Sequence, residues 1–187
     1  MKHADDEVIL DLIKNSGSLE RGFRALMEKY QEKLYWNIRR MVLNHDDADD
    51  VLQNTFIKVY RNIGQFEQKS SLFTWLYRIA TNETLSFIER NKKWKYDNLE
   101  DQSEHPAILA LKSDPYFDGD EISLRLEAAV LTLPDKQRQV FQMRYYEEMS
   151  YRDIAEILNT SEGALKASFH HAVKKIEEFV KSKEDSF

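Results

Sequence analysis

The sequence predicts an all-α protein, and three observations support this fold class. Apolar residues recur three or four positions apart along most of the chain, which places them on one face of a helix. Residues that interrupt helices are scarce, with 5 glycines and 3 prolines among 187 residues. Hydrophobic residues make up 42% of the chain, enough to build packed cores. We therefore expect two small helical domains.

The weakest helical pattern comes first, around residues 7–14, and three stronger ones follow it. Apolar positions advance by three or four from Phe23 to Met41, from Ala48 to Ile63 and from Leu72 to Ile88. The stripe over 48–63 alternates steps of three and one, which is typical of a well-buried face. These stretches predict a helical bundle as the N-terminal domain, residues 1–96.

The helix over 48–63 begins in the segment HDDADDV, residues 45–51, which holds four aspartates. Carboxylates in a first helical turn cap free N–H groups and suit the positive end of the helix dipole, which accounts for Asp46 or Asp47. His45 and Asp46 also resemble the metal-binding pair of metal-dependent phosphohydrolases. Such a site needs further histidines nearby, whereas the other four lie far along the chain or at its start.

The opposite face of this helix is polar and contains one β-branched apolar residue, Ile57. A single exposed apolar side chain is common on protein surfaces. Surrounded by acids, amides and bases, however, it is typical of a protein-docking surface. The predicted docking residues are Asp47, Asp50, Gln53, Asn54, Ile57, Lys58 and Arg61.

An aromatic segment follows at residues 66–77 and combines rings with hydroxyl and basic groups. Rings stack on unpaired bases while hydroxyls and bases hold the backbone, so the mixture suits single-stranded nucleic acid. The same rings equally suit a core. The residues concerned are Phe66, Lys69, Ser70, Ser71, Phe73, Trp75 and Tyr77, with a basic helix end at Arg90, Lys92 and Lys93.

Residues 97–121 hold eight acidic residues and one lysine, together with two of the three prolines. The net charge of this segment is −7, whereas that of the whole chain is −6. The rest of the chain therefore carries a net charge of +1. Concentrated like charge with prolines is typical of a solvated linker. We expect an acidic interdomain linker over 97–121 and a second domain over 122–187.

The second domain predicts a helix-turn-helix unit. A helix follows Pro134, a break lies near 147–149, and a short helix over 150–158 leads through a turn at 159–161 into a final helix. Ser150 can cap the short helix, and Thr160 or Ser161 can cap the last one. We expect apolar residues of the two helices to face each other. The short helix contributes Ile154, Ala155, Ile157 and Leu158, and the last helix contributes Leu165, Phe169, Val173 and Ile176.

The outward strip of the last helix is small, basic and rich in histidine. His170 and His171 are neighbours about 100° apart on the helix, so they form a poor chelate. The strip suits phosphates and base edges of a major groove, although a merely solvated face has the same composition. The candidate contacts are Ser161, Glu162, Lys166, Ala167, Ser168, His170, His171 and Lys174.

The absence of cysteine excludes disulfides and thiolate metal sites and favours a reducing compartment. No apolar run approaches the ~20 residues that cross a bilayer, and the N-terminus MKHADDEVIL is too acidic for a signal peptide. We expect a soluble, cytoplasmic protein.

Taken in order, three motifs resemble one family, the extracytoplasmic function (ECF) group of sigma-70 RNA polymerase sigma factors. Residues 46–63 resemble its core-polymerase-binding helix, 70–93 its segment for minus-ten recognition and promoter melting, and 133–176 its minus-thirty-five-reading domain. The resemblance implies a protein that is not an enzyme, needs no cofactor, and binds core RNA polymerase and promoter DNA. It adds Arg78 and Asn82 to the minus-ten contacts, with Asn82 and the loop 66–73 holding a flipped base. Family members are often held inactive by an anti-sigma factor, so such a factor is a further candidate partner.

Two departures from the family pattern affect these expectations. Asn54 stands where glutamate is common, which puts one polymerase contact in doubt, and the last helix has lysine and histidine where arginines are common. Fewer bidentate guanine contacts then remain, so DNA binding by the isolated chain should be weak.

Two alternatives belong to other function classes. A stand-alone helix-turn-helix repressor would leave the aromatic segment and Ile57 without a role. A metal-dependent phosphohydrolase would use His45 and Asp46 but lacks partner ligands.

Overall fold

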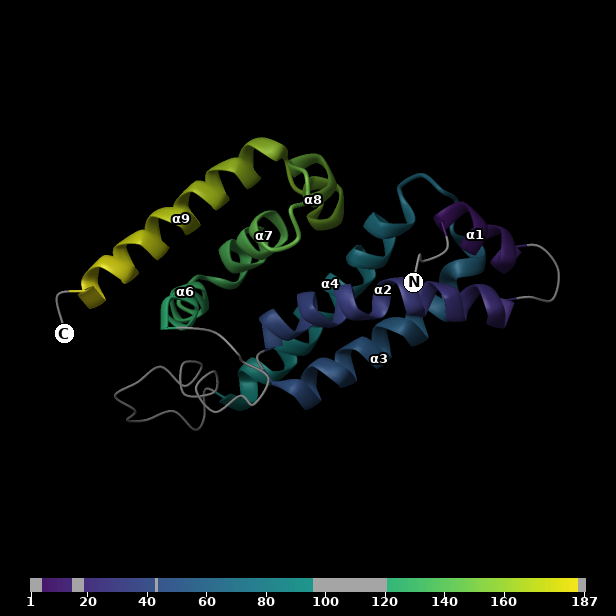
Figure 1. Ribbon diagram of the computed structural model, residues 1–187, viewed down its shortest axis with the longest axis horizontal. Coiled ribbons are helices and arrows are strands. Elements are labelled where there is room, and N and C mark those ends of the chain that lie inside the picture. Colours follow the sequence, from purple (N-terminus) through teal and green to yellow (C-terminus); the bar gives the residue numbers. More distant parts are fainter. Residues whose placement is uncertain (1–4, 15–18, 43, 96–120, 185–187) are drawn as a thin grey trace. The chain divides into compact units, whose positions relative to one another are not determined.

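The computed structural model describes residues 5–14, 19–42, 44–95 and 121–184. In these ranges the chain forms eight α-helices and one short 3-10 helix, and no strand (Figure 1). The predicted all-α class is confirmed. The chain divides into two compact units, Met1–Lys92 and Lys93–Phe187. The predicted acidic linker lies outside the described residues except for Glu121, which begins a helix.

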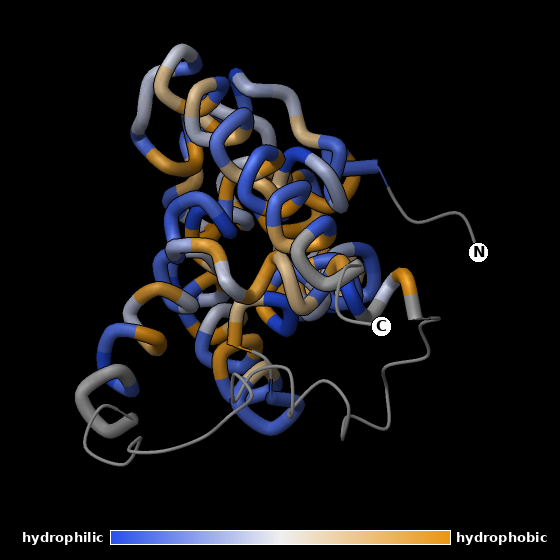
Figure 2. Tube along the Cα trace, turned by 90° about the vertical axis from the view of Figure 1, so that its left-hand side faces the viewer, coloured by the Kyte–Doolittle hydropathy of each residue, from blue (hydrophilic) through white to orange (hydrophobic). Residues whose placement is uncertain are grey.

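Unit one contains the four predicted helices, each within a few residues of its expected range. They are α1 (Asp6–Lys14), α2 (Leu19–Val42), α3 (His45–Asn62) and α4 (Leu72–Lys95), with the 3-10 helix η1 (Ile63–Gln65) after α3. Helix α2 lies against both α1 and α3 (Figure 1). Hydrophilic and hydrophobic residues alternate along the helices (Figure 2), as expected for amphipathic helices that bury one face. The innermost side chains include Leu26, Leu34, Ile38, Val59 and Leu76, each with 0% exposed area.

Asn44 caps α3, which corrects the prediction that Asp46 or Asp47 does so. Its side-chain oxygen accepts hydrogen bonds from the backbone N–H groups of Asp46 and Asp47, at 2.8 and 3.2 Å. Both aspartates lie in the first turn, where their charge suits the helix dipole. Asn44, two residues before the first aspartate, has the extended backbone that a cap needs, and an amide oxygen serves as well as a carboxylate.

Gly22 allows α1 and α2 to approach closely. A Cβ atom at this position would lie 2.6 Å from Ile13 Cγ1, 2.9 Å from Ile13 N and 3.1 Å from Ile9 O. Two of these three neighbours are backbone atoms, which cannot rotate away.

We therefore expect Gly22→Ala to lower the free energy of unfolding of unit one by about 1–2 kcal/mol. Overpacking costs roughly 1–3 kcal/mol, and the higher helix propensity of alanine returns at most about 1 kcal/mol. The matched control is Gly163→Ala, where nothing lies within 4 Å of the added carbon, so stability should rise slightly. Urea denaturation of the full-length variants tests this, and equal stabilisation by both would contradict the close approach.

A buried tyrosine also links α1 to α2. The Tyr30 hydroxyl donates a hydrogen bond to Asp6 Oδ1 at 2.7 Å, and Lys29 Nζ donates to the same oxygen at 2.8 Å. Burial, then the hydrogen bond to Asp6 and its negative charge, raise the pKa of Tyr30 above its ordinary value.

The raised pKa of Tyr30 predicts a loss of stability in alkali. Below about pH 10 the hydroxyl is protonated in both the folded and the unfolded chain, so its stabilising contribution is fully present. At higher pH the unfolded chain loses this proton more readily, and the contribution is lost. The free energy of unfolding should fall less steeply as the pH rises above about 10 in Tyr30→Phe than in the wild type. Identical slopes in urea titrations would contradict this.

Unit two contains α6 (Glu121–Leu131), α7 (Asp135–Tyr145), α8 (Tyr151–Leu158) and α9 (Glu162–Glu184). The last three match the predicted helix-turn-helix region, whereas α6 was not predicted as a helix. It supplies Ala129 and Val130 to a core that α7 and α9 complete with Phe141, Ala172 and Ile176. The apolar pattern of α6 is short, and the helix begins at the end of the acidic segment. The sequence pattern therefore did not identify it as a helix.

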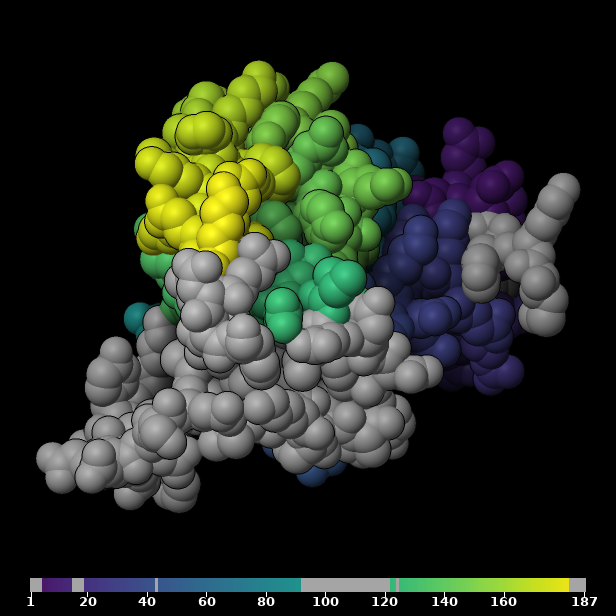
Figure 3. Space-filling view, turned by 60° about the vertical axis from the view of Figure 1, so that its left-hand side comes forward, coloured from purple at the N-terminus to yellow at the C-terminus, as the bar shows by residue number. Residues whose placement is uncertain are grey.

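The turn between α8 and α9 has the chemistry that the sequence predicts. Ser150 caps α8 by accepting from Asp153 N at 3.1 Å, and Asn159 ends it in the left-handed conformation with φ 50°. Ser161 Oγ accepts from Ala164 N at 3.3 Å, so Ser161 rather than Thr160 caps α9. The side chains of α8 and α9 pack together and form one surface (Figure 3).

Candidate functional site

The predicted docking face of α3 lies on the surface of unit one. Ile57 has 43% of its area exposed, so the predicted apolar residue in a polar field is confirmed. Asp50, Gln53, Asn54 and Arg61 are exposed around it, and Asp47 is half-buried. Lys58 is also exposed but forms an ion pair with Glu83 of α4. Its ammonium group is thus partly engaged within the unit.

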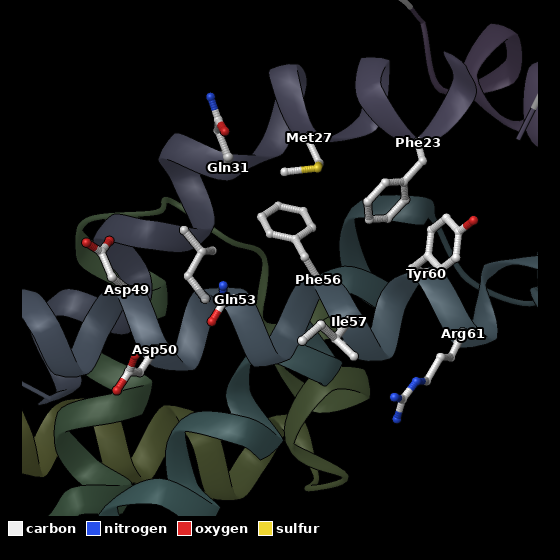
Figure 4. A pocket seen from close by; sticks show the side chains of 11 residues that line it. Phe23, Met27, Gln31, Asp49, Asp50, Gln53, Phe56, Ile57, Tyr60 and Arg61 are labelled. Carbon is white, nitrogen blue, oxygen red and sulfur yellow. The ribbon is translucent and has the colours of Figure 1, made fainter. Parts of the chain in front are cut away.

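A hollow between α2 and α3 adjoins Ile57, with a volume of about 720 Å³. Phe23 and Met27 of α2 face Phe56 and Tyr60 of α3 across it (Figure 4). The Phe23 ring makes edge contacts with both other rings, with centroids 6.1 Å from Phe56 and 5.0 Å from Tyr60. The remaining lining residues are Gln31, Asp49, Asp50, Leu52, Gln53, Ile57 and Arg61. We call this hollow the α2–α3 groove.

The groove corrects part of the predicted apolar stripe on α3. Tyr60 was expected on the buried face but is 44% exposed, and Leu52 is only half-buried. The stripe is wider than the area that α2 covers, so its edge remains open as the groove floor. Phe23 and Met27 were not predicted as functional because helical spacing alone assigns them to the core.

His45 at the start of α3 has protein partners at both ring nitrogens. Nδ1 lies 2.7 Å from the Tyr35 hydroxyl, and Nε2 lies 3.4 Å from Asp49 Oδ2. Within the described ranges, no three histidine, cysteine, aspartate or glutamate side chains form a group that could hold a metal. The geometry around His45 therefore gives the phosphohydrolase alternative no support.

The aromatic segment corrects two predicted nucleic-acid contacts. Phe66 and Tyr77 are 5% and 0% exposed, so both rings belong to the core. Phe73 and Trp75 are half-buried and lie against them, with centroids 4.3 Å apart for Phe73 and Tyr77 and 5.1 Å for Phe66 and Trp75. Ring-rich composition does not distinguish a core from a stacking surface.

The polar residues near the start of α4 include a second cap. Ser71 accepts from Thr74 N at 3.0 Å, so its hydroxyl caps α4 while the side chain remains exposed. Lys69 is exposed and pairs with Glu67, and Ser70 is half-buried.

A polar face runs along α4 behind this segment. Asn82 lies one turn after Arg78 and shares its face, whereas Arg90 lies eight positions after Asn82, about 80° around the helix from it. Asn82 and Arg90 are exposed and Arg78 is half-buried. Lys92 and Lys93 fall within α4, but their side chains lie outside the described residues. Asn82 thus presents an accessible amide beside basic groups.

The outward strip of α9 is exposed as predicted, except that Ser168 is half-buried. Lys166 Nζ lies 3.6 Å from Glu162 Oε2, and Lys174 Nζ lies 3.9 Å from Glu178 Oε1. The His170 and His171 ring centroids are 5.9 Å apart, and both rings are exposed. Of the predicted buried face, Leu165 and Ile176 are buried while Phe169 and Val173 are half-buried. The carboxylates of Glu162 and Glu178 beside these two lysines lower the net positive charge of the strip.

Two family models match separate parts of the chain. Sigma-70 region 2 matches residues 26–94, and Sigma-70, region 4, matches residues 123–176. The first match runs from residue 26, inside α2, to residue 94 of α4, and it includes the groove residues except Phe23. The second spans the four helices of unit two up to the middle of α9.

Curated relatives align over most of the chain. It is 34% identical over 157 residues to the ECF RNA polymerase sigma factor SigW of Bacillus subtilis, covering 79% of this chain and 83% of the relative. It is 32% identical over 165 residues to the RNA polymerase sigma-H factor of Pseudomonas aeruginosa, covering 84% and 86%. The ECF RNA polymerase sigma-E factor of Escherichia coli is 27% identical over 179 residues, with 92% of each chain covered.

Solved structures share the fold at lower identity. The sigma factor RpoE of Bartonella quintana, in complex with the anti-sigma factor NepR, has a TM-score of 0.69 at 23% identity, covering 86% of this chain and 98% of that one. CnrH, in complex with the cytosolic domain of CnrY, has a TM-score of 0.69 at 18% identity, covering 95% and 97%. No helix in the described ranges is long and apolar enough to span a membrane.

Proposed function

Because the chain belongs to the ECF group of sigma-70 RNA polymerase sigma factors and directs promoter recognition, we propose that it docks on core polymerase through the α2–α3 groove. The protein is not an enzyme. The observation that carries the proposal is the groove itself, with Phe23, Phe56 and Tyr60 as an apolar floor beside the exposed Ile57. Exposed aromatic and aliphatic side chains with a polar rim are typical of interface centres.

The proposed docking surface enlarges the predicted one. It keeps Asp50, Gln53, Ile57 and Arg61, which line the groove, together with Asp47 and Asn54 beside it. Phe23, Met27 and Tyr60 are added because they line the groove with aromatic and thioether side chains. Lys58 is assigned a smaller role, since its ammonium group pairs with Glu83.

Strand opening is assigned to the polar face of α4 and the loop before it. A flipped base costs a few kcal/mol of stacking, which an amide and a stacking surface can offset. Asn82 is exposed and supplies the amide, while the half-buried rings of Phe73 and Trp75 supply partly accessible stacking surface. Arg78, on the face of Asn82, and Arg90, two turns further along α4, would hold backbone phosphates, with Lys69, Ser70 and Ser71 at the loop and Lys92 and Lys93 at the helix end.

Unit two is proposed to read the minus-thirty-five element with the exposed strip of α9. Gly163 and Ala167 near the helix start leave room for close approach to a major groove, and Lys166, His170, His171 and Lys174 surround them. We retain the proposal that residues 97–121 form the acidic linker between domains 1–96 and 122–187, lying in a basic polymerase channel. We also place the protein in the cytoplasm, where core polymerase works.

An anti-sigma factor is proposed as a further partner. One solved structure that shares this fold is a sigma factor in complex with the anti-sigma factor NepR, and another is CnrH in complex with the cytosolic domain of CnrY. A partner that covers the α2–α3 groove would exclude polymerase by occupying the same apolar floor.

Transcription by core polymerase on a genomic DNA library, with and without this chain, tests the function. We expect co-migration of the chain with core polymerase in gel filtration, and new start sites that share one upstream motif. DNA binding to a palindrome without polymerase, and no co-migration, would favour the repressor alternative.

The α9 strip predicts a selective loss in promoter use. Lys166→Ala and His171→Ala each remove a contact to DNA, and one such contact is worth about 1–3 kcal/mol. Promoter-dependent transcription in vitro should fall by roughly tenfold, or more, in each variant, while polymerase binding is unchanged. Unaltered transcription on the selected promoter would contradict the assignment of α9.

A further inference from the structure

The ammonium group of Lys166 is held in place by two neighbours in the free protein. Its Nζ lies 5.6 Å from the ring centroid of Tyr151 on α8 and 3.6 Å from Glu162 Oε2, one turn earlier on α9. A cation within about 6 Å of an aromatic centroid is attracted by the electron-rich ring face. The Lys166 side chain is nevertheless 60% exposed, so it remains accessible to a ligand.

The Tyr151 ring is itself fixed from several sides. The edge-on ring of Phe169 lies 6.4 Å away at 78°, and Phe169 stacks on Phe141 at 5.7 Å and 13°. Phe141 is 4% exposed and belongs to the core of unit two. A line of aromatic contacts thus connects the core to the ring that holds Lys166.

A second cation fixes the same ring to the turn before α8. Arg144 Cζ lies 5.3 Å from the Tyr151 centroid, and Arg144 Nη1 donates a hydrogen bond to the carbonyl of Met149 at 2.9 Å. Tyr151 is the first residue of α8, and Ser150 caps that helix directly before it. The ring therefore has little freedom to move away from Lys166.

We infer that Tyr151 is a positioning residue for promoter binding: its ring holds the Lys166 ammonium group ready to meet a phosphate of duplex DNA. This inference rests on the proposed function of α9. A lysine side chain is flexible and loses rotamer freedom when it binds. Holding it beforehand removes part of that loss from the binding step. Tyr151 acts through Lys166 and does not itself need to touch DNA.

A double-mutant cycle tests the coupling. Tyr151→Leu is combined with wild-type Lys166 and with Lys166→Ala, each in the full chain bound to core polymerase. The probe is the promoter fragment on which the wild type directs a start site. We expect Tyr151→Leu to weaken binding about two- to tenfold when Lys166 is present, the range for ordering one flexible side chain, and to have almost no effect in Lys166→Ala.

Two results would overturn the inference. An equal loss of binding from Tyr151→Leu in both backgrounds would mean that Tyr151 only supports the fold. A loss of binding in a separate variant, Tyr151→Phe, which keeps the ring, would mean that the hydroxyl contacts DNA directly. A wild-type chain that binds no promoter with polymerase overturns the proposed function and the inference together, whereas an additive cycle on a working promoter overturns the inference alone.

A measurement without DNA checks the contact itself. The ε-methylene protons of Lys166 should show an upfield ring-current shift in the NMR spectrum of the full chain. The shift should persist in Tyr151→Phe and vanish in Tyr151→Leu. Absence of the shift in the wild type would overturn the inference.

Discussion

We expect Ile57→Asp to abolish binding to core polymerase while the chain remains folded. The isoleucine is 43% exposed on α3, so a carboxylate there can remain hydrated in the free protein. In the complex the same carboxylate would be desolvated against an apolar partner surface without a counter-charge. Removing an apolar anchor and burying an unpaired charge each cost several kcal/mol. We expect affinity to fall by at least about 100-fold, which corresponds to about 2.7 kcal/mol.

The matched control for this experiment is Ile122→Asp. Ile122 is 77% exposed on α6 in unit two and is not one of the residues of the proposed docking surface. Both variants should retain wild-type far-ultraviolet circular dichroism, and Ile122→Asp should retain polymerase binding in gel filtration and fluorescence titration. Wild-type affinity in Ile57→Asp would show that a different face of unit one docks.

We expect Asn82→Ala to slow promoter opening more than it weakens initial promoter binding. The amide is exposed on the polar face of α4, and a base that leaves the stack needs hydrogen bonds to replace those it loses. Loss of an amide partner leaves the polar edge of that base unsatisfied, at a cost of about 1–3 kcal/mol. Permanganate reactivity of unpaired thymines should therefore develop roughly ten times more slowly, or slower still.

Asn62→Ala is the matched control for Asn82→Ala. Asn62 is also exposed, at the end of α3, and its side chain donates to the Lys58 carbonyl within its own helix. This variant should open promoters at the wild-type rate. Equal rates in Asn82→Ala and the wild type, with initial binding measured by gel shift, would contradict the base-holding role.

Helical periodicity alone determined most of the fold. The apolar stripes of α2, α3 and α4 and the order of helix, turn and helix in unit two follow from spacing, because a repeat of 3.6 residues fixes which side chains share a face. Ser150 and the turn at 159–161 could be identified because capping and left-handed backbone depend on short local sequence. The family resemblance also followed from contiguous motifs.

One helix and one helix cap could not be identified from the sequence. α6 was missed because its eleven residues adjoin the acidic segment. Asn44 was passed over in favour of the aspartates beside it, since all three side chains can cap and only the backbone geometry separates them.

Tertiary structure decided which side chains are available for binding. The sequence predicted that Phe66 and Tyr77 contact nucleic acid, but both rings are buried. It predicted that Tyr60 lies on the buried face of α3, but this side chain is exposed. The α2–α3 groove needs Phe23 and Tyr60 side by side, and the hold on Lys166 needs Tyr151 from another helix. Sequence periodicity defines the faces of one helix, whereas the area that a neighbouring helix covers depends on how far apart and at what angle the two pack.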